Sequence, residues 1–323
     1  MKKLGIRLTG ILLCLVLLAC PVSAARLLIP VGQVVGLELG DGTVTVAAFD
    51  DVLGAAAKEA GLQVGDRILR VEGEPVAQPE EVGQLLARSD GTVELEILRG
   101  RRQRTLTMTP VITRQGPKLG VFLRRGVTGI GTVTWYDPDT GEFATLGHGV
   151  SDSRGGLVQL QQGWAYEARV ESVKKGKSGV PGQLRGQTVS AEPLGDLTRN
   201  CVQGVFGVTG AGWKGQELPA AEYGQIHTGP ARIYSTVRGS RTEEFQVEIL
   251  KIYPQNRQDG RNFLLKVTDP VLLDAAGGIV QGMSGSPILQ DGRLVGAVTP
   301  VLVNDPTRGY GIFIENMLAA SGR

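Results

Sequence analysis

A serine surrounded by glycines, in the run Gly282-Met283-Ser284-Gly285-Ser286, is the stretch of this sequence that could most directly carry out chemistry. Glycine lets the backbone turn tightly, so that amide N–H groups can lie beside the serine hydroxyl. Acyl transfer to serine needs such donors, because the oxyanion formed during attack must meet preorganised hydrogen bonds. We predict Ser284 as the nucleophile and the Gly282 and Ser284 amides as the oxyanion hole. Ser286 is an alternative nucleophile, and the motif alone also fits an ordinary turn.

A hydroxyl needs a neighbouring base to become nucleophilic, and imidazole is the side chain suited to this at neutral pH. The sequence has two histidines, His148 and His227. His148 stands between two glycines at the end of a predicted strand, where a bend would direct the ring out of the sheet. His227 lies in a turn-like stretch and ranks second. Two histidines are too few for the common histidine zinc centres, so we predict no metal and no cofactor.

A carboxylate is expected as the third member, to orient the imidazole and stabilise its protonated form. The candidates are Asp152, Asp196, Asp269 and Asp274. Asp269 follows a predicted strand over residues 263–268 and precedes a proline, which places it on ordered backbone. We therefore predict Asp269 as the orienting carboxylate.

The elements that must position these residues are mainly β-strands. The chain has 323 residues, of which 47 are glycine and 16 proline, and short Val, Ile, Leu and Thr runs recur between turn signals. Residues 129–136 and 142–146 are predicted strands joined by a turn, and Asp291-Gly292 predicts a hairpin directly after the serine loop. Further strand-like runs separate His148 from Asp269. This pattern predicts a trypsin-like double β-barrel with the site in the cleft.

A different unit precedes the barrel. Residues 60–73 read Ala-Gly-Leu-Gln-Val-Gly-Asp-Arg-Ile-Leu-Arg-Val-Glu-Gly and resemble the PDZ domains of exported bacterial proteases. Strands over 34–39 and 43–49, joined by a turn at 40–42, and a helix over 79–88 complete the expected α+β domain. The resemblance implies that a peptide adds to a sheet edge and that a backbone loop captures its carboxylate. We place that site at Gly32, Gln33 and Val34.

The first 24 residues have the form of an export signal. Lys2, Lys3 and Arg7 precede an apolar run over residues 11–22, and small residues follow. We predict a signal peptide or N-terminal membrane anchor over 1–24, a PDZ domain over 25–113 and a serine peptidase domain over 114–323. Processing as a lipoprotein at Cys20 is a weaker alternative. Cys201 alone would remain in the exported chain, so no intramolecular disulfide is expected.

The PDZ unit, residues 129–152 and residues 277–311 together resemble the stage IV sporulation protein B family of secreted serine peptidases. The resemblance implies a triad of His148, Asp269 and Ser284. It also implies self-cleavage near the N-terminus and cleavage of a membrane regulatory protein that inhibits an intramembrane metalloprotease, which leads to sigma-factor processing. The implied location is the space between the forespore and mother-cell membranes.

The competing class is a binding protein, in which the PDZ domain docks a peptide ligand and the barrel is an inactive scaffold. Replacing Ser284 would abolish function only in an enzyme. A formal net charge of +2 argues against nucleic acid as a partner, because such binding rests on clustered basic residues.

Overall fold

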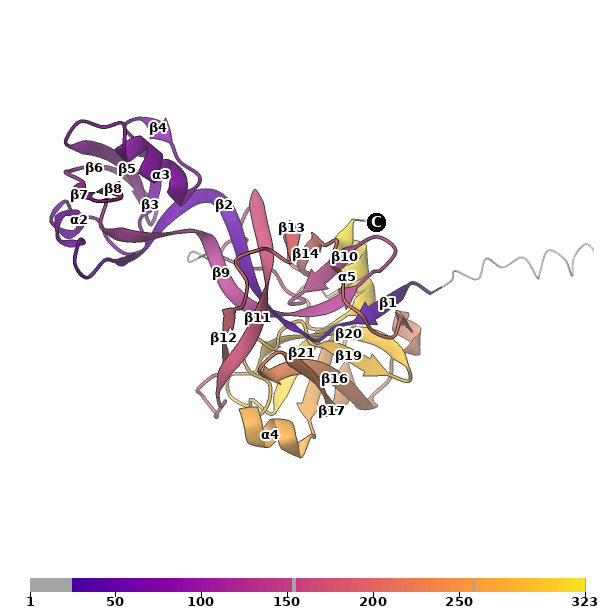
Figure 1. Ribbon diagram of the computed structural model, residues 1–323. Helices are drawn as coiled ribbons and strands as arrows, with labels where there is room; N and C mark the ends of the chain where they lie inside the picture. The colour runs from indigo at the N-terminus through magenta and orange to yellow at the C-terminus, as the bar shows by residue number, and fades with distance from the viewer. Residues whose placement is uncertain (1–24, 153–154, 258, 323) are drawn as a thin grey trace, which may run out of the picture.

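The computed structural model describes residues 25–152, 155–257 and 259–322 and consists mainly of β-strands (Figure 1). The predicted leader and the lipoprotein alternative lie outside these residues. Within the described part of the chain, none of the helices has the length and apolarity needed to cross a bilayer.

Two six-stranded barrels form the body of the molecule. In the first, pairing runs around the ring β2-β9-β10-β14-β13-β11 and returns to β2. The second is the closed barrel β16-β17-β18-β21-β20-β19. The prediction of a double β-barrel is confirmed. The first barrel consists of β2 Val34–Phe49, β9 Val121–Tyr136, β10 Glu142–Thr145, β11 Gln162–Lys174, β13 Gly195–Cys201 and β14 Gly204–Val208.

The second barrel holds the largest buried cluster, which includes Phe245, Phe263 and Phe313. The predicted hairpin at Asp291-Gly292 is present, and both residues have positive φ, as a tight two-residue turn requires. The elements of this half are β16 Gly229–Arg238, β17 Arg241–Ile252, β18 Phe263–Val267, α4 Pro270–Ala276, β19 Pro287–Gln290, β20 Arg293–Val301, β21 Arg308–Phe313 and α5 Ile314–Ser321.

Short elements link the two barrels. Strand β1, Leu27–Pro30, pairs with β15, Leu218–Pro219, and with the end of β9. A 3-10 turn, η1, spans Tyr223–Gln225, and β12, Gln183–Thr188, extends from β11 as a hairpin.

A two-stranded ribbon carries the PDZ unit away from the first barrel (Figure 1). Strands β2 and β9 are each 16 residues long, and their pairing runs from Val34 opposite Thr132 to Phe49 opposite Val121. The turn predicted at residues 40–42 is instead a register shift between Leu39 and Val44. Gly40 and Gly42 therefore lie at a bulge in one continuous strand rather than in the turn of a hairpin.

The PDZ unit itself is built between the two ribbon strands, with its own core around Ile68, Leu95 and Ile97. Its predicted helix is present as α3, which buries Val82, Leu85 and Leu86. Its elements are α2 Ala55–Glu59, β3 Arg67–Val71, β4 Glu74–Pro75, α3 Pro79–Leu86, β5 Val93–Arg99, β6 Arg102–Met108, β7 Val111–Thr113 and β8 Gly116–Lys118.

The structure therefore changes the predicted domain boundary at residues 25 and 113. Residues 34–39 pair with β9 and β11 inside the first barrel, and only the second half of β2 belongs to the PDZ sheet. The PDZ unit is an insertion into a barrel hairpin. Composition alone does not reveal this division, because the two strands that leave the barrel contain the same kinds of residue as PDZ strands.

Candidate active site

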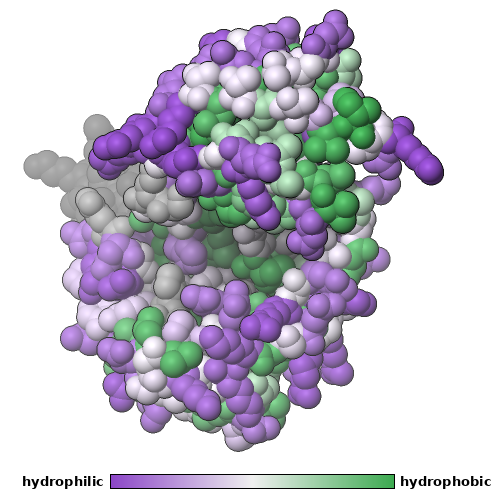
Figure 2. Space-filling view, turned by 90° about the vertical axis from the view of Figure 1, so that its left-hand side faces the viewer, coloured by the Kyte–Doolittle hydropathy of each residue, from purple (hydrophilic) through white to green (hydrophobic). Residues whose placement is uncertain are grey.

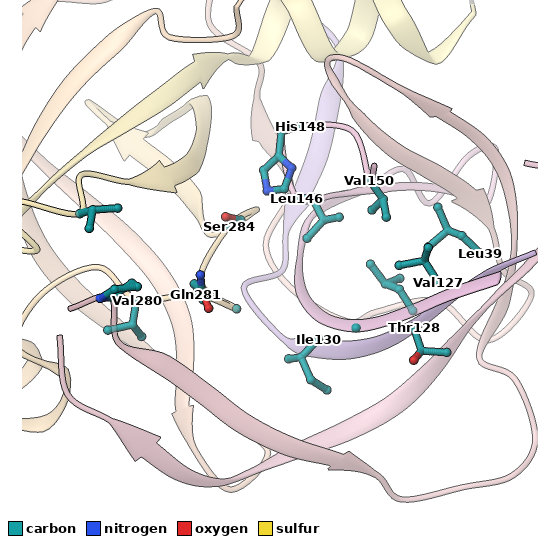
Figure 3. Close-up of a pocket in the computed structure, with 15 residues that line it drawn as sticks. Leu39, Val127, Thr128, Ile130, Leu146, His148, Val150, Val280, Gln281 and Ser284 are labelled. Carbon is teal, nitrogen blue, oxygen red and sulfur yellow. The ribbon is translucent and has the colours of Figure 1, made fainter. Parts of the chain in front are cut away.

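His148 and Ser284 come from different barrels and line the same pocket, a cavity of about 450 Å³ (Figure 3). His148 follows β10, and Ser284 lies in the loop between α4 and β19. In Figure 3 the imidazole points down toward the Ser284 side chain. The structure thus brings together the predicted base and the predicted nucleophile.

The backbone bends sharply just before His148. Leu146 and Gly147 both have positive φ, 69° and 66°, which is costly for leucine and ends the strand. A side chain at Gly147 would also approach Ile312 and Thr299 within 3.0 and 3.2 Å. The predicted glycine-histidine bend is present, and it is held by packing against the second barrel.

The His148 ring has a defined tautomer. Its Nδ1 lies 3.0 Å from the carbonyl oxygen of Gly149. A carbonyl only accepts hydrogen bonds, so Nδ1 carries the proton and Nε2 is left as an acceptor. This is the form that a general base requires.

Burial lowers the pKa of His148 below its usual value, and the hydrogen bond to the Gly149 carbonyl opposes this in part. Because the base must be neutral, a lower pKa extends activity toward acid. We expect the acid limb of kcat/KM to lie below pH 6.5, the usual histidine value of about 6.5 being its upper bound. A pH profile of peptide cleavage or serine labelling checks this, and a limb above pH 7 would contradict it.

Neighbouring groups hold the carbonyls of Gln281 and Met283, the residues before the two predicted oxyanion-hole amides. The Gln281 carbonyl accepts from the Leu184 amide of β12 at 2.8 Å, and the Met283 carbonyl accepts from the Ser286 amide at 2.9 Å. In a trans peptide the C=O and N–H groups point in opposite directions, so these bonds fix the N–H directions of Gly282 and Ser284. Within the described chain, neither of those two amides donates to a protein acceptor.

Thr132 on β9 joins the two halves of the site. Its hydroxyl donates to the Gly282 carbonyl at 2.7 Å, and its amide donates to the Ser284 carbonyl at 3.1 Å. Its carbonyl accepts from the Leu146 amide at 3.2 Å, two residues before His148. Thr132 is fully buried. One residue therefore ties the serine loop to the histidine loop.

Replacing Thr132 with valine removes the hydroxyl but keeps the shape. The Gly282 carbonyl would lose its partner, which we expect to cost about 1–3 kcal/mol of unfolding free energy and to slow serine labelling. Thr132→Ser keeps the hydroxyl and serves as the matched control, because it should restore the labelling rate. Urea unfolding and labelling kinetics measure both effects, and equal labelling rates for the two variants would contradict the assignment.

Asp269 is not brought to His148. Its carboxylate accepts from the Val271 and Leu272 amides at the start of α4 and from the Gln246 amide. Gly260, before β18, lies near Gly147, whereas Asp269 follows the other end of that five-residue strand, which by itself spans about 16 Å. The proline that favoured Asp269 as a fixed point marks a helix start, where aspartate is a preferred cap.

The other candidates also lie outside the pocket. Asp274 is on the exposed side of α4 and pairs with Lys175, and Asp196 is on β13. The Asp152 carboxylate accepts from the Gly156 amide in its own loop. His227 pairs with Asp291 at 2.7 Å on the surface, and its Thr228 carbonyl and Asp291 contacts raise its pKa. Ser286 is fully buried and is not among the residues that line the cavity.

The residues placed in the PDZ carboxylate loop lie between the barrels instead. Gly32 donates to the Val133 carbonyl, and its carbonyl accepts from the Thr236 hydroxyl. Gln33 accepts from the Trp213 indole at 2.8 Å, and Val34 is fully buried in the core shared with the second barrel. These residues have no free edge to offer a peptide, so the prediction of Gly32, Gln33 and Val34 as PDZ ligand contacts is wrong.

Comparison with protein families gives two matches. A model of the SpoIVB peptidase S55 family matches residues 115–318. The chain belongs to the SpoIVB peptidase S55 family. A PDZ domain model matches residues 52–99, which lie within the unit carried by the ribbon. The predicted family and the PDZ domain are confirmed. The family is one of serine peptidases linked to sporulation.

Two solved structures of other proteins are similar to parts of this S55 peptidase. The PDZ domain of the SdrC-like protein from Listeria monocytogenes is 23% identical, covering 25% of this chain and 85% of that chain with a TM-score of 0.22. The Rv3671c protease in its inactive form is 14% identical, covering 61% of this chain and 85% of that chain with a TM-score of 0.35. No curated protein matches the chain.

Sequence reasoning missed Thr132 and Leu184 as parts of this S55 site. Both act through backbone or hydroxyl contacts across more than 90 residues of chain. A threonine within a β-strand run carries no local signal of such a role. The distant strand β12 was likewise not expected to hold the Gly282 loop.

Proposed function

We propose that this chain is a serine endopeptidase that works with Ser284 as nucleophile and His148 as base and then acid. The observation that carries the proposal is the meeting of His148 and Ser284 from two barrels in one pocket. His148 and Ser284 are far apart in sequence, and only the fold brings them into one pocket. Their convergence is the arrangement that acyl transfer from serine requires.

In the proposed reaction, His148 Nε2 removes the Ser284 proton as Oγ attacks the peptide carbonyl. The Gly282 and Ser284 amides then receive the oxyanion, supported by the fixed carbonyls of Gln281 and Met283. His148 returns the proton to the leaving amine, and water hydrolyses the acyl-enzyme by the same steps. The Gly149 carbonyl orients the imidazole in the position that sequence reasoning gave to Asp269.

A fluorophosphonate probe tests this proposal on the purified full chain. We expect wild-type protein to be labelled and Ser284→Ala to remain unlabelled. Ser286→Ala is the matched control, because its hydroxyl is buried two residues away and lacks a partner among the described groups. Labelling that survives Ser284→Ala would refute the assignment, and a folded wild type without labelling would favour the inactive-scaffold alternative.

The PDZ unit is proposed to bind an extended peptide, at an edge different from the one predicted. Residues 121–125 of β9 pair on one side with β2, and helix α3 packs nearby. The Leu119 and Gly120 amides before this strand donate to no described backbone carbonyl. An open strand preceded by free amides is what terminal-carboxylate capture uses. Stronger binding of a free-carboxylate peptide than of its amidated form would support this site.

The biological setting remains part of the proposal and rests on family membership. The chain is exported, acts on a membrane regulatory protein during spore formation and cleaves itself near its N-terminus. Incubation of wild type and Ser284→Ala side by side, followed by N-terminal sequencing, tests self-cleavage. A shortened product in both would assign the cut to another protease.

A further inference from the structure

The pocket beside Ser284 has an apolar wall supplied mainly by β2 and β9. Leu37 and Leu39 of β2 and Val127 of β9 line it, together with Leu146 and Val150 beside His148 (Figure 3). No Asp, Glu, Lys or Arg side chain is among the described residues that line it. Figure 2, seen from the PDZ side, shows hydrophobic residues within the recess of this face.

One position on this wall has no side chain. Gly129 lies directly opposite Leu37 in the ribbon, and residues paired across antiparallel strands project to the same face. A Cβ built on Gly129 meets no atom within 4 Å. The pocket is therefore deepened at Gly129 by the absence of a side chain, and the backbone there would accept a larger residue.

We infer that this pocket binds a large apolar side chain, aliphatic or aromatic, of a substrate residue next to the scissile bond, and that Gly129 sets the size it accepts. The inference rests on the proposed peptidase function and adds the substrate class to it. A cavity of about 450 Å³ has room for such a group, and an apolar wall without charge favours it over lysine, arginine or acidic residues. The nucleophile and base open onto the same cavity, which places the bound side chain beside the reacting carbonyl.

The test is digestion of a peptide library by the full chain. Mass spectrometry then identifies the residues on both sides of each cut. Matched peptides with Leu, Phe or Ala at the preferred position then give kcat/KM ratios. We expect the wild type to favour Leu or Phe over Ala by about tenfold or more, since burying such a side chain contributes that much discrimination. Gly129→Leu should reduce this ratio to about one or reverse it.

Gly210→Leu is the matched control, because Gly210 is an exposed glycine whose added Cβ also meets no atom within 4 Å. It should leave the ratio unchanged, and circular dichroism verifies the fold of both variants. Cleavage without a preference for large apolar residues, or a preference that Gly129→Leu leaves unmoved, would overturn this inference alone. Absence of both cleavage and Ser284 labelling would instead overturn the proposed function.

Discussion

Replacement of His148 by alanine is expected to lower kcat by on the order of 10⁴, while Asp269→Asn leaves it within about threefold. Without the imidazole, no group in the pocket can take the Ser284 proton near neutral pH. Asp269 is occupied as the cap of α4, and asparagine caps helices about as well as aspartate. The two variants therefore separate a site oriented by the Gly149 carbonyl from one that needs Asp269.

Steady-state cleavage and the rate of fluorophosphonate labelling provide the measurements. Asp269→Ala is the useful companion variant, because loss of the cap should cost about 1 kcal/mol of unfolding free energy without removing the base. A loss of kcat in Asp269→Asn that matches His148→Ala would contradict our view. It would show that the aspartate reaches the imidazole in the working enzyme and that the α4 start must rearrange.

Replacement of Gly285 by alanine is expected to displace the catalytic loop and abolish labelling. Gly285 has φ of +98°, and an added Cβ would lie 2.0 Å from the Thr132 carbonyl oxygen and 2.5 Å from the Leu146 amide nitrogen. Both contacts are backbone and cannot rotate away. Relief of the clash must separate the serine loop from β9, at a cost of more than about 3 kcal/mol.

Gly83→Ala is the control for this prediction, since Gly83 lies inside α3 and an added Cβ meets nothing within 4 Å. Alanine in a helix interior should stabilise the protein by about 0.5–1 kcal/mol. Chemical unfolding and labelling of both variants give the comparison. Normal labelling by Gly285→Ala would mean that the loop tolerates a different path and that the Thr132 contacts are dispensable.

The sequence could predict those parts of the site that depend on short local motifs. Gly282 to Gly285 and the glycines around His148 each encode an unusual backbone locally, so the two loops and their residues could be found. Asp269 shows the limit of such reasoning. A strand end followed by proline is equally typical of a helix cap, and only the fold decides between the two roles.

The fold was predictable as far as strand patterns and the PDZ motif allow, but its topology was not. Residues 34–49 have the composition of a hairpin, yet they form one strand shared by two units. Local composition indicates which residues favour extended structure, but it does not indicate which strand each of them will pair with. For the same reason Thr132 and Leu184, whose partners are distant in sequence, gave no signal.

The insertion of the PDZ unit into a barrel hairpin also has a consequence for how the protein is made. Val34 must wait until Thr132 has been synthesised before the two can pair, whereas the β2–β3, β3–β5 and β5–β6 pairs of the PDZ unit join residues no more than 31 positions apart. Because local contacts form faster than distant ones, the PDZ unit should fold first as the chain emerges. By closing, it brings the two barrel strands side by side, so that it acts as an internal template for the peptidase that surrounds it.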